Sequence, residues 1–315
     1  MQPKLIRWVL AHEPIEIFIR AAERFAEVIE QKVPGQIKIE VLTLTEYANK
    51  YNNGVTITKH ELLDLMEQDK IEMSQMYTYV LSKYNQDLNA LDMPFLFKDH
   101  EHAARVFEGP VGKALLAGYS KNNNNIKGMA FTYSGGFKNV PLNKDITSLS
   151  ELVGTKVRVS NSPICAATFA NLGAEPVVMD IEELAAGMED GRVNGGESSW
   201  PRIYACGQNE TSKTILNSDH SLLLTNIIVN TNFFKSLSPE LQAVMEEAAV
   251  EAARYERDIS VSEVEPTSAR ATKDGIRVLK LSDADRVTFE KAAAKVYDQF
   301  DGYFTAGLID NIRSA

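Results

Sequence analysis

Residues 5–41 read LIRWVLAHEPIEIFIRAAERFAEVIEQKVPGQIKIEV, and this stretch decides the fold class. The apolar run at residues 5–10 predicts a strand. Apolar residues then recur at three- and four-residue spacing, Pro34-Gly35 ends that pattern, and residues 37–41 alternate like a second strand. The buried face of the helix is predicted to consist of Phe18, Ala21, Ala22, Phe25 and Ile29.

The same alternation continues along the chain. Thr58 and Glu61 form a capping box for a second helix, and a third apolar strand follows at residues 71–76. A β-α-β-α-β order within 76 residues is typical of an α/β sheet. The residues around 47–53 suggest either a lid or a surface loop.

Similar patterns predict the later elements. Apolar runs place strands at residues 126–133, 156–159 and 222–230. Capping pairs, Ser148 with Glu151 and Asp180 with Glu183, predict two further helices. A long helix begins at Pro239 and breaks near Pro266, and a last one covers residues 285–298. The buried face of the long helix is predicted to hold Leu241, Val244, Met245, Ala248, Ala252, Tyr255 and Ile259.

Composition narrows the function classes. The chain has 315 residues, a formal net charge of −10 and two cysteines. The acidic balance argues against nucleic acid as a partner, and no apolar run is long enough to span a membrane. One disulfide, between Cys165 and Cys206, is compatible with the sequence. No signal peptide is visible, so the chain reads as cytosolic or as a mature form. We expect no cofactor, metal site or catalytic constellation, because no glycine-rich nucleotide loop, HExxH or GxSxG pattern occurs.

One segment carries a strong chemical signal. Residues 154–161 read GTKVRVSN and place Arg158 on a short apolar strand. A cation in such a core is rare unless it is paired, and strand ends of α/β sheets bind ligands. Arg158 therefore either binds an acid through two parallel hydrogen bonds or forms a salt bridge with Asp180 or Glu197.

Two further segments stand out. Residues 184–198 read LAAGMEDGRVNGGES, which is either a plain helix-turn-strand or part of a site. Residues 92–97, DMPFLF, favour a buried apolar loop.

These three segments, in this order and spacing, resemble the solute-binding proteins of tripartite ATP-independent periplasmic (TRAP) transporters, the DctP-type family. The resemblance covers nearly the whole chain. It implies an α/β fold of two lobes, a class II-like periplasmic binding protein with a long helix spanning both lobes. We expect lobe I at residues 1–133 plus 222–262 and lobe II at residues 134–221 plus 263–315, to within about ten residues.

The resemblance also assigns ligand-binding residues. The family's defining arginine falls on Arg158, and a second basic residue, 20 positions earlier, falls on Lys138. The segment before Trp200 aligns Glu197 and Ser198 with ligand contacts, although an amide is usual at the position of Ser198. Trp200 is expected to supply a wall. The ends of the first and third strands add four more candidates: His12, Glu13, Tyr77 and Thr78. His12 and Glu13 also fit a solvated helix start.

The implied function is capture of a small organic acid, a carboxylate by default or a sulfonate, by closure of a cleft. The expected partners are the acid and the membrane subunits of a TRAP transporter, and the chain is expected to be a periplasmic monomer. Two alternatives stay open: a sensor that presents the acid to a receptor, and a small-acid enzyme with His12 or Glu13 as base. The sequence does not name the ligand.

Overall fold

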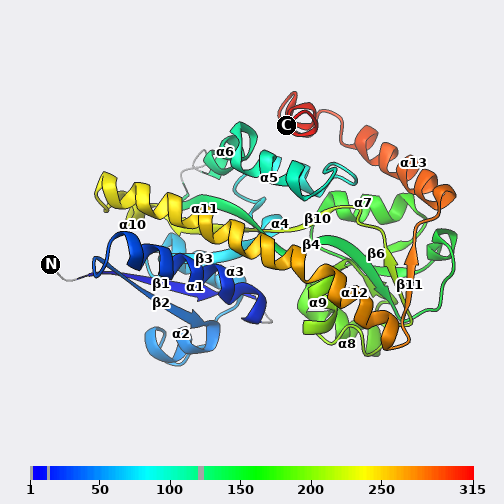
Figure 1. The fold of residues 1–315 in the computed structure, drawn as a ribbon, viewed down its shortest axis with the longest axis horizontal. Helices are drawn as coiled ribbons and strands as arrows, with labels where there is room; N and C mark the ends of the chain where they lie inside the picture. The colour runs from blue at the N-terminus through cyan, green and yellow to red at the C-terminus, as the bar shows by residue number, and fades with distance from the viewer. Residues whose placement is uncertain (1–2, 13–14, 120–123) are drawn as a thin grey trace. The chain divides into compact units, whose positions relative to one another are not determined.

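The computed structural model describes residues 3–12, 15–119 and 124–315. The chain forms two compact units. Unit 1 comprises residues 1–85, 107–133 and 224–259, and unit 2 comprises residues 86–106, 134–223 and 260–315. Helices and strands alternate in both units (Figure 1), which confirms the predicted α/β class. No helix in the described ranges combines the length and the apolar composition that a bilayer crossing requires.

The division differs from the expected one at residues 86–106, which belong to unit 2. The ring of Phe95 packs edge-on against Phe289 at 5.0 Å, and its backbone N–H donates to the carbonyl of His220 over 2.7 Å. The Tyr297 hydroxyl donates to the Pro94 carbonyl. These long-range contacts hold the segment in unit 2, and the sequence around it contains no sign of them.

Unit 1 is built on a sheet with the strand order β2-β1-β3-β10-β4. β1 pairs in parallel with β2 and β3, whereas β10 is antiparallel to β3. Helix α1 lies beside α11 in Figure 1, and ion pairs Arg24–Glu251 and Lys32–Glu247 join them. The elements of unit 1 are β1 (Lys4–Leu10), α1 (Ile15–Lys32), β2 (Ile37–Thr43), α2 (Leu44–Tyr51), α3 (Lys59–Glu67), β3 (Met73–Tyr77), α4 (Thr78–Leu81), α6 (Pro110–Ala117), the first part of β4 (Ile126–Leu142), most of β10 (Leu222–Asn230), α10 (Thr231–Lys235) and most of α11 (Pro239–Ser262).

Unit 2 contains a second set of strands. β5 lies between β6 and β7 in parallel, and β4 pairs antiparallel with β7, β8 and β9. β9 also pairs in parallel with β11. The elements of unit 2 are η1 (Gln86–Asp92), most of α5 (His100–Glu108), η3 (Leu149–Leu152), β5 (Lys156–Val159), α7 (Pro163–Asn171), β6 (Glu175–Val178), η4 (Ile181–Glu183), α8 (Leu184–Glu189), β7 (Gly195–Gly196), β8 (Ser198–Ser199), α9 (Trp200–Ala205), β9 (Thr214–Asn217), α12 (Val264–Lys273), β11 (Arg277–Lys280), α13 (Asp283–Gln299) and α14 (Leu308–Arg313).

Helix α1 shows why the opening stretch forms these elements. All five apolar residues predicted to face inward are buried. Burial of each large side chain contributes about 1.5–3 kcal/mol, which is far more than helix propensity supplies. The capping box of Thr58 and Glu61 is also present, at the start of α3.

Several predicted elements need correction. Residues 44–51 form helix α2, begun by a capping box at Thr43, so most of the segment at 47–53 is helical and not a surface loop. The capping box at Ser148 starts only a 3-10 turn, and Asp180 makes no side-chain cap. The break after α11 falls at Glu263, so that Pro266 lies within the first turn of α12, where proline is tolerated.

The buried face of α11 also differs from the prediction. Tyr255 is 45% exposed and lies near the Arg24 guanidinium, whereas Glu256 is fully buried. The Glu256 carboxylate accepts from Gln75 Nε2 at 2.8 Å and from Thr132 Oγ1 at 2.6 Å. Polar partners on β3 and β4 thus draw an acidic residue into the core, which apolar periodicity does not anticipate.

Glu256 makes the stability of the protein depend on pH. Burial raises the pKa of this carboxyl to about 8, even though hydrogen bonds from Thr132 and Gln75 oppose the shift. The folded state therefore holds a proton that the unfolded state releases near pH 4.5. The free energy of unfolding should fall as pH rises from about 4.5 to about 8, because the unfolded chain binds fewer protons in this range.

Glu256→Gln removes this titration while it keeps a neutral side chain of the same shape. From pH 6 to pH 8 the wild type should lose about 2–3 kcal/mol of stability relative to this variant. Urea unfolding at both pH values measures the difference, with Glu265→Gln as the control, since Glu265 is exposed on α12. If the free energy of unfolding changed equally with pH in the wild type and in Glu256→Gln, the Glu256 carboxyl would already be ionised in the folded state at pH 6, contrary to this prediction.

Candidate ligand-binding site

Arg158 lies at the centre of unit 2, on β5. Its side chain is 1% exposed. Nε donates to the Met179 carbonyl over 2.7 Å and Nη1 donates to the Glu197 carbonyl over 3.2 Å. Nη2 is buried and has no hydrogen-bond partner in the described part of the chain. The guanidinium is therefore held in place by two neutral acceptors, and one of its nitrogens is left to bind something else.

This arrangement does not support the salt-bridge alternative for Arg158. Neither the Asp180 carboxylate nor that of Glu197 forms an ion pair with it among the described residues. Gly196 lies opposite Arg158 in the β5–β7 pairing, and a Cβ there would lie 2.6 Å from the Arg158 Cβ. Only glycine permits this approach, so the Asn194-Gly195-Gly196 segment brings Glu197 close to the arginine.

Lys138 lies in the second half of β4 and is equally buried. Its Nζ is 3.3 Å from Glu197 Oε1, 3.4 Å from Asp92 Oδ1 and 3.3 Å from the Cys165 Sγ. Burial alone would lower the pKa of this ammonium, but the hydrogen bond to Cys165 and the charges of Glu197 and Asp92 hold it above its ordinary value. Lys138 is thus a charged residue whose partners are two carboxylates of the protein.

Glu197 connects the lysine to a histidine. Its Oε1 also lies 3.0 Å from His220 Nε2, and His220 Nδ1 is 2.8 Å from the Ser218 hydroxyl. Burial would raise the pKa of Glu197, but the charge of Lys138 and the bond from His220 outweigh it and hold the pKa well below its usual range. The second oxygen, Oε2, is buried without a hydrogen-bond partner in the described structure.

Cys165 lies beside this network as a thiol. Burial raises the pKa of the thiol, and the carboxylates of Asp92 and Glu197 raise it further. Cys165 and Cys206 are both free, so the disulfide that the sequence left open is not formed.

Ser198 and Trp200 follow Glu197 along the chain. The Ser198 hydroxyl is buried and lacks a partner among the described residues, so it is free to donate or accept. Trp200 packs in an apolar cluster with Ile203 and Ile215, and its Nε1 donates to Asn217 Oδ1 over 3.0 Å. This packing gives Trp200 the role of a core residue and does not support the predicted role of a ligand wall.

The candidates of unit 1 form a group of their own. The backbone N–H of Tyr77 lies 3.4 Å from His12 Nε2, and the two rings contact each other at 4.3 Å. Thr78 donates from Oγ1 to Asn226 Oδ1 over 2.8 Å, and the Nδ2 of Asn226 is buried without a partner in the described chain. His12 is 3% exposed and so is not a solvated helix start. Glu13 lies outside the described residues.

Sequence analysis missed three residues of these groups. His220 lies just before β10 and Asn226 lies within it, in a run that signals only a buried strand, and Asp92 is the first residue of the segment predicted as an apolar loop. They reach the site through tertiary contacts, which no local pattern reveals. No group of three or more potential metal ligands occurs in the described ranges.

Comparison with known proteins agrees with this architecture. The C4-dicarboxylate-binding periplasmic protein DctP of Rhodobacter capsulatus is 28% identical over 96% of this chain and 91% of its own length. A TRAP periplasmic solute-binding protein from Ochrobactrum anthropi superposes with a TM-score of 0.84 at 26% identity, covering 99% of this chain and 94% of that one. A second, from Shewanella oneidensis with bound succinate, gives a TM-score of 0.85 at 23% identity, with 99% of both chains covered.

The resemblance read from the sequence is thereby confirmed. Residues 11–302 match the family described as bacterial extracellular solute-binding protein, family 7, DctP. The matched range includes Arg158, Lys138 and Glu197 and spans both units. The chain is a member of the DctP family of bacterial extracellular solute-binding proteins.

Proposed function

We propose that this protein binds a small organic acid outside the cytoplasm and delivers it to the membrane subunits of a TRAP transporter. The Rhodobacter relative is named for C4-dicarboxylates, and the Shewanella structure holds succinate. The observation that carries the proposal is the buried Arg158 Nη2, which has no hydrogen-bond partner in the described chain. The other two nitrogens of the guanidinium, Nε and Nη1, each donate to a backbone carbonyl. A ligand carboxylate would neutralise this charge and satisfy the free N–H groups.

The neighbours of Arg158 favour an acid that also carries a hydrogen-bond donor. Glu197 Oε2 is an acceptor on an ionised carboxylate, and the Ser198 hydroxyl is able to donate or accept. A hydroxyl or amino group on the ligand would satisfy Glu197, whereas a plain apolar acid would leave it unpaired. Hydroxy acids and sugar acids therefore fit this pair better than unsubstituted acids.

Lys138 has a supporting role in this proposal. Its ammonium is already shared between Glu197 and Asp92, so it holds Glu197 in place and adds positive potential beside Arg158. The proposal also includes ligand contact by His12, Tyr77 and Thr78, since Asn226 Nδ2 beside Thr78 is a buried donor that a ligand oxygen would satisfy.

The proposal is for binding without turnover, by a periplasmic monomer. Ser218, His220 and Glu197 form a line of hydrogen bonds, but Ser218 is only 2% exposed and Glu197 also pairs with Lys138. This arrangement suits a network that positions Glu197. Capture by closure of a cleft stays the prediction that the family resemblance implies.

A thermal-shift screen on protein that has been refolded to strip bound ligand tests the proposal. The panel contains succinate, hydroxy acids, uronates, amino-acid derivatives and sulfonates, each with its neutral amide as the matched control. A ligand at about 1,000 times its Kd adds about 4 kcal/mol, which raises the Tm by several degrees. We expect an acid, and not its amide, to give this shift. A shift of equal size with the amide would contradict the proposal, and so would chemical conversion of the acid, followed by NMR.

A further inference from the structure

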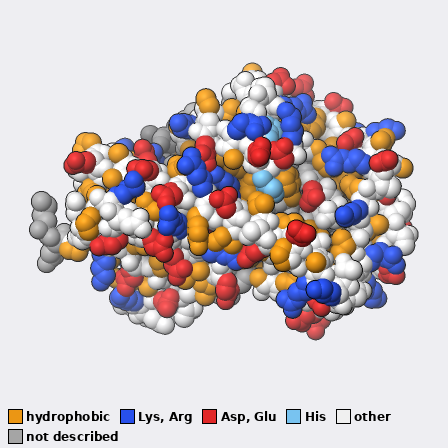
Figure 2. Space-filling view, in the orientation of Figure 1, with side chains coloured by type: hydrophobic (Ala, Val, Ile, Leu, Met, Phe, Trp, Pro, Cys, Tyr) orange, Lys and Arg blue, Asp and Glu red, His pale blue; other side chains and the backbone are white. Residues whose placement is uncertain are grey.

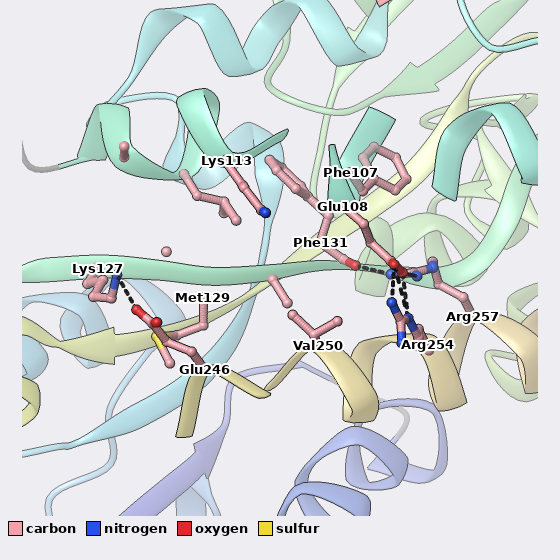
Figure 3. Close-up of a pocket in the computed structure, with 14 residues that line it drawn as sticks. Phe107, Glu108, Lys113, Lys127, Met129, Phe131, Glu246, Val250, Arg254 and Arg257 are labelled. Atoms are coloured by element: carbon pink, nitrogen blue, oxygen red, sulfur yellow. Dashed lines mark hydrogen bonds and ion pairs between the residues drawn. The ribbon is translucent and has the colours of Figure 1, made fainter. Parts of the chain in front are cut away.

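Unit 1 contains a pocket of about 460 Å³ that the proposed function does not use. It is lined by the end of α5, by α6, by the first part of β4 and by α11 (Figure 3). All of its lining residues belong to unit 1, whereas Arg158 belongs to unit 2. The volume suits a ligand of drug-like size.

The middle of the pocket is apolar. Leu116 and Ala117 of α6, Met129 and Phe131 of β4, and Val250 of α11 line it. In Figure 3, Val250 lies between the two charged ends of the pocket, and Met129 lies beside Glu246 at one of them. Such walls favour a ligand with an apolar chain or ring, since each buried methylene raises affinity about fourfold.

The charged groups around this middle are not balanced. Arg254 and Arg257 both pair with one carboxylate, Glu108, while Arg257 Nη1 also donates to the Phe131 carbonyl over 2.7 Å. At the other end, Lys127 pairs with Glu246 at 3.2 Å. The pocket thus holds more cations than carboxylates.

Lys113 adds a further positive charge. It projects from α6 toward β4 (Figure 3), and no ion pair joins it to a carboxylate among the residues that the structure describes. Four cations and two carboxylates line the pocket, although the whole chain has a net charge of −10. Figure 2 shows acidic and basic side chains intermixed on the face in view. The excess of positive charge around the pocket therefore differs from the mixed charge of that surface.

We propose that this pocket binds an amphipathic carboxylate, in which an apolar chain or ring carries one acidic group. The apolar part would lie against Met129 and Val250, and the carboxylate would pair with Lys113. The two guanidiniums on Glu108 would attract the same charge over a longer range. This would be a second binding site, independent of the small acid at Arg158.

Calorimetric titration of the stripped protein with octanoate and decanoate, below their micelle concentrations, tests the proposal. Decanoate should bind about 15-fold more tightly than octanoate, because it buries two more methylenes. Lys113→Gln should weaken decanoate about 10-fold, since it removes the charge-assisted contact. Lys291→Gln, at an exposed lysine on α13, is the matched control and should change nothing.

Two more variants locate the site. Val250→Phe should abolish decanoate binding, because the larger ring fills the pocket. Arg158→Ala should leave decanoate binding unchanged. Loss of decanoate binding in Arg158→Ala, full binding in Lys113→Gln, or no binding to the wild type would overturn the proposal. Lys113-dependent binding to phosphatidylglycerol vesicles without binding of free decanoate would overturn it too, in favour of a lipid headgroup. If Val250→Phe fails to fold, Lys113→Gln still decides, since Lys113 is exposed.

Discussion

Replacing Arg158 with alanine is expected to weaken binding of the small acid by about 100-fold or more. The variant loses the charge that meets the ligand carboxylate, and truncation of one partner of a buried ion pair costs about 2–5 kcal/mol. Arg158→Lys should fall between the wild type and the alanine variant. Lysine keeps the charge but cannot donate at once to the ligand and to the carbonyls of Met179 and Glu197. Calorimetry with the acid from the thermal-shift screen measures all three affinities.

The matched control for this series is Arg286→Ala. Arg286 lies on α13 in the same unit, is 46% exposed at its side chain and pairs with Glu290 at the surface. The Arg286→Ala variant should bind the acid with wild-type affinity. Circular dichroism must show that Arg158→Ala is folded before its affinity is interpreted. A folded Arg158→Ala that binds the acid as tightly as Arg286→Ala would show that Arg158 has only a structural role.

Replacing Lys138 with methionine is expected to destabilise the protein by about 3–5 kcal/mol. Methionine fills the space of the side chain but leaves Asp92 and Glu197 without the ammonium that both contact. Removal of one member of a buried ion pair costs this much because the remaining charge is uncompensated. Urea unfolding measures the change. Lys291→Met, at an exposed site, should stay within about 0.5 kcal/mol of the wild type.

A second substitution separates charge from packing at this site. Glu197→Gln in the Lys138→Met background removes one of the stranded carboxylates and should recover part of the lost stability. If Lys138→Met unfolds at the wild-type urea concentration, the ion pairs of Lys138 do not stabilise the core of unit 2.

Local patterns in the sequence predicted some elements fully and others only in part. β5 and β10 agree with the expected ranges, although Arg158 interrupts the valines of β5 and Thr225 and Asn226 interrupt the apolar residues of β10. β4 is much longer than expected, because Gly135 and Gly136 interrupt the apolar pattern. Both glycines have a positive φ, +93° and +88°, so the strand continues through backbone conformations that signal a turn in sequence.

The candidate site shows a similar limit. Arg158 was identifiable because a charged residue on a short apolar strand contradicts the pattern around it. The hydrogen-bond partners of Arg158 could not be identified from the sequence. They are the backbone carbonyls of Met179 and Glu197, and every residue type has a backbone carbonyl. His220 contacts Glu197, which is 23 residues away in the sequence. The burial of Glu256 on α11 depends on hydrogen-bond partners on two strands, β3 and β4. Such contacts are products of the tertiary fold.

The most direct test of the central claim combines a change in the ligand with a change in the protein. Wild type and Arg158→Ala are each titrated calorimetrically with the acid from the screen and with its carboxamide. The wild type should bind the acid about 100-fold more tightly than the amide, whereas Arg158→Ala should bind both with equal affinity. Equal affinity of the wild type for acid and amide, or an undiminished preference for the acid in Arg158→Ala, would contradict the claim that Arg158 binds the carboxylate.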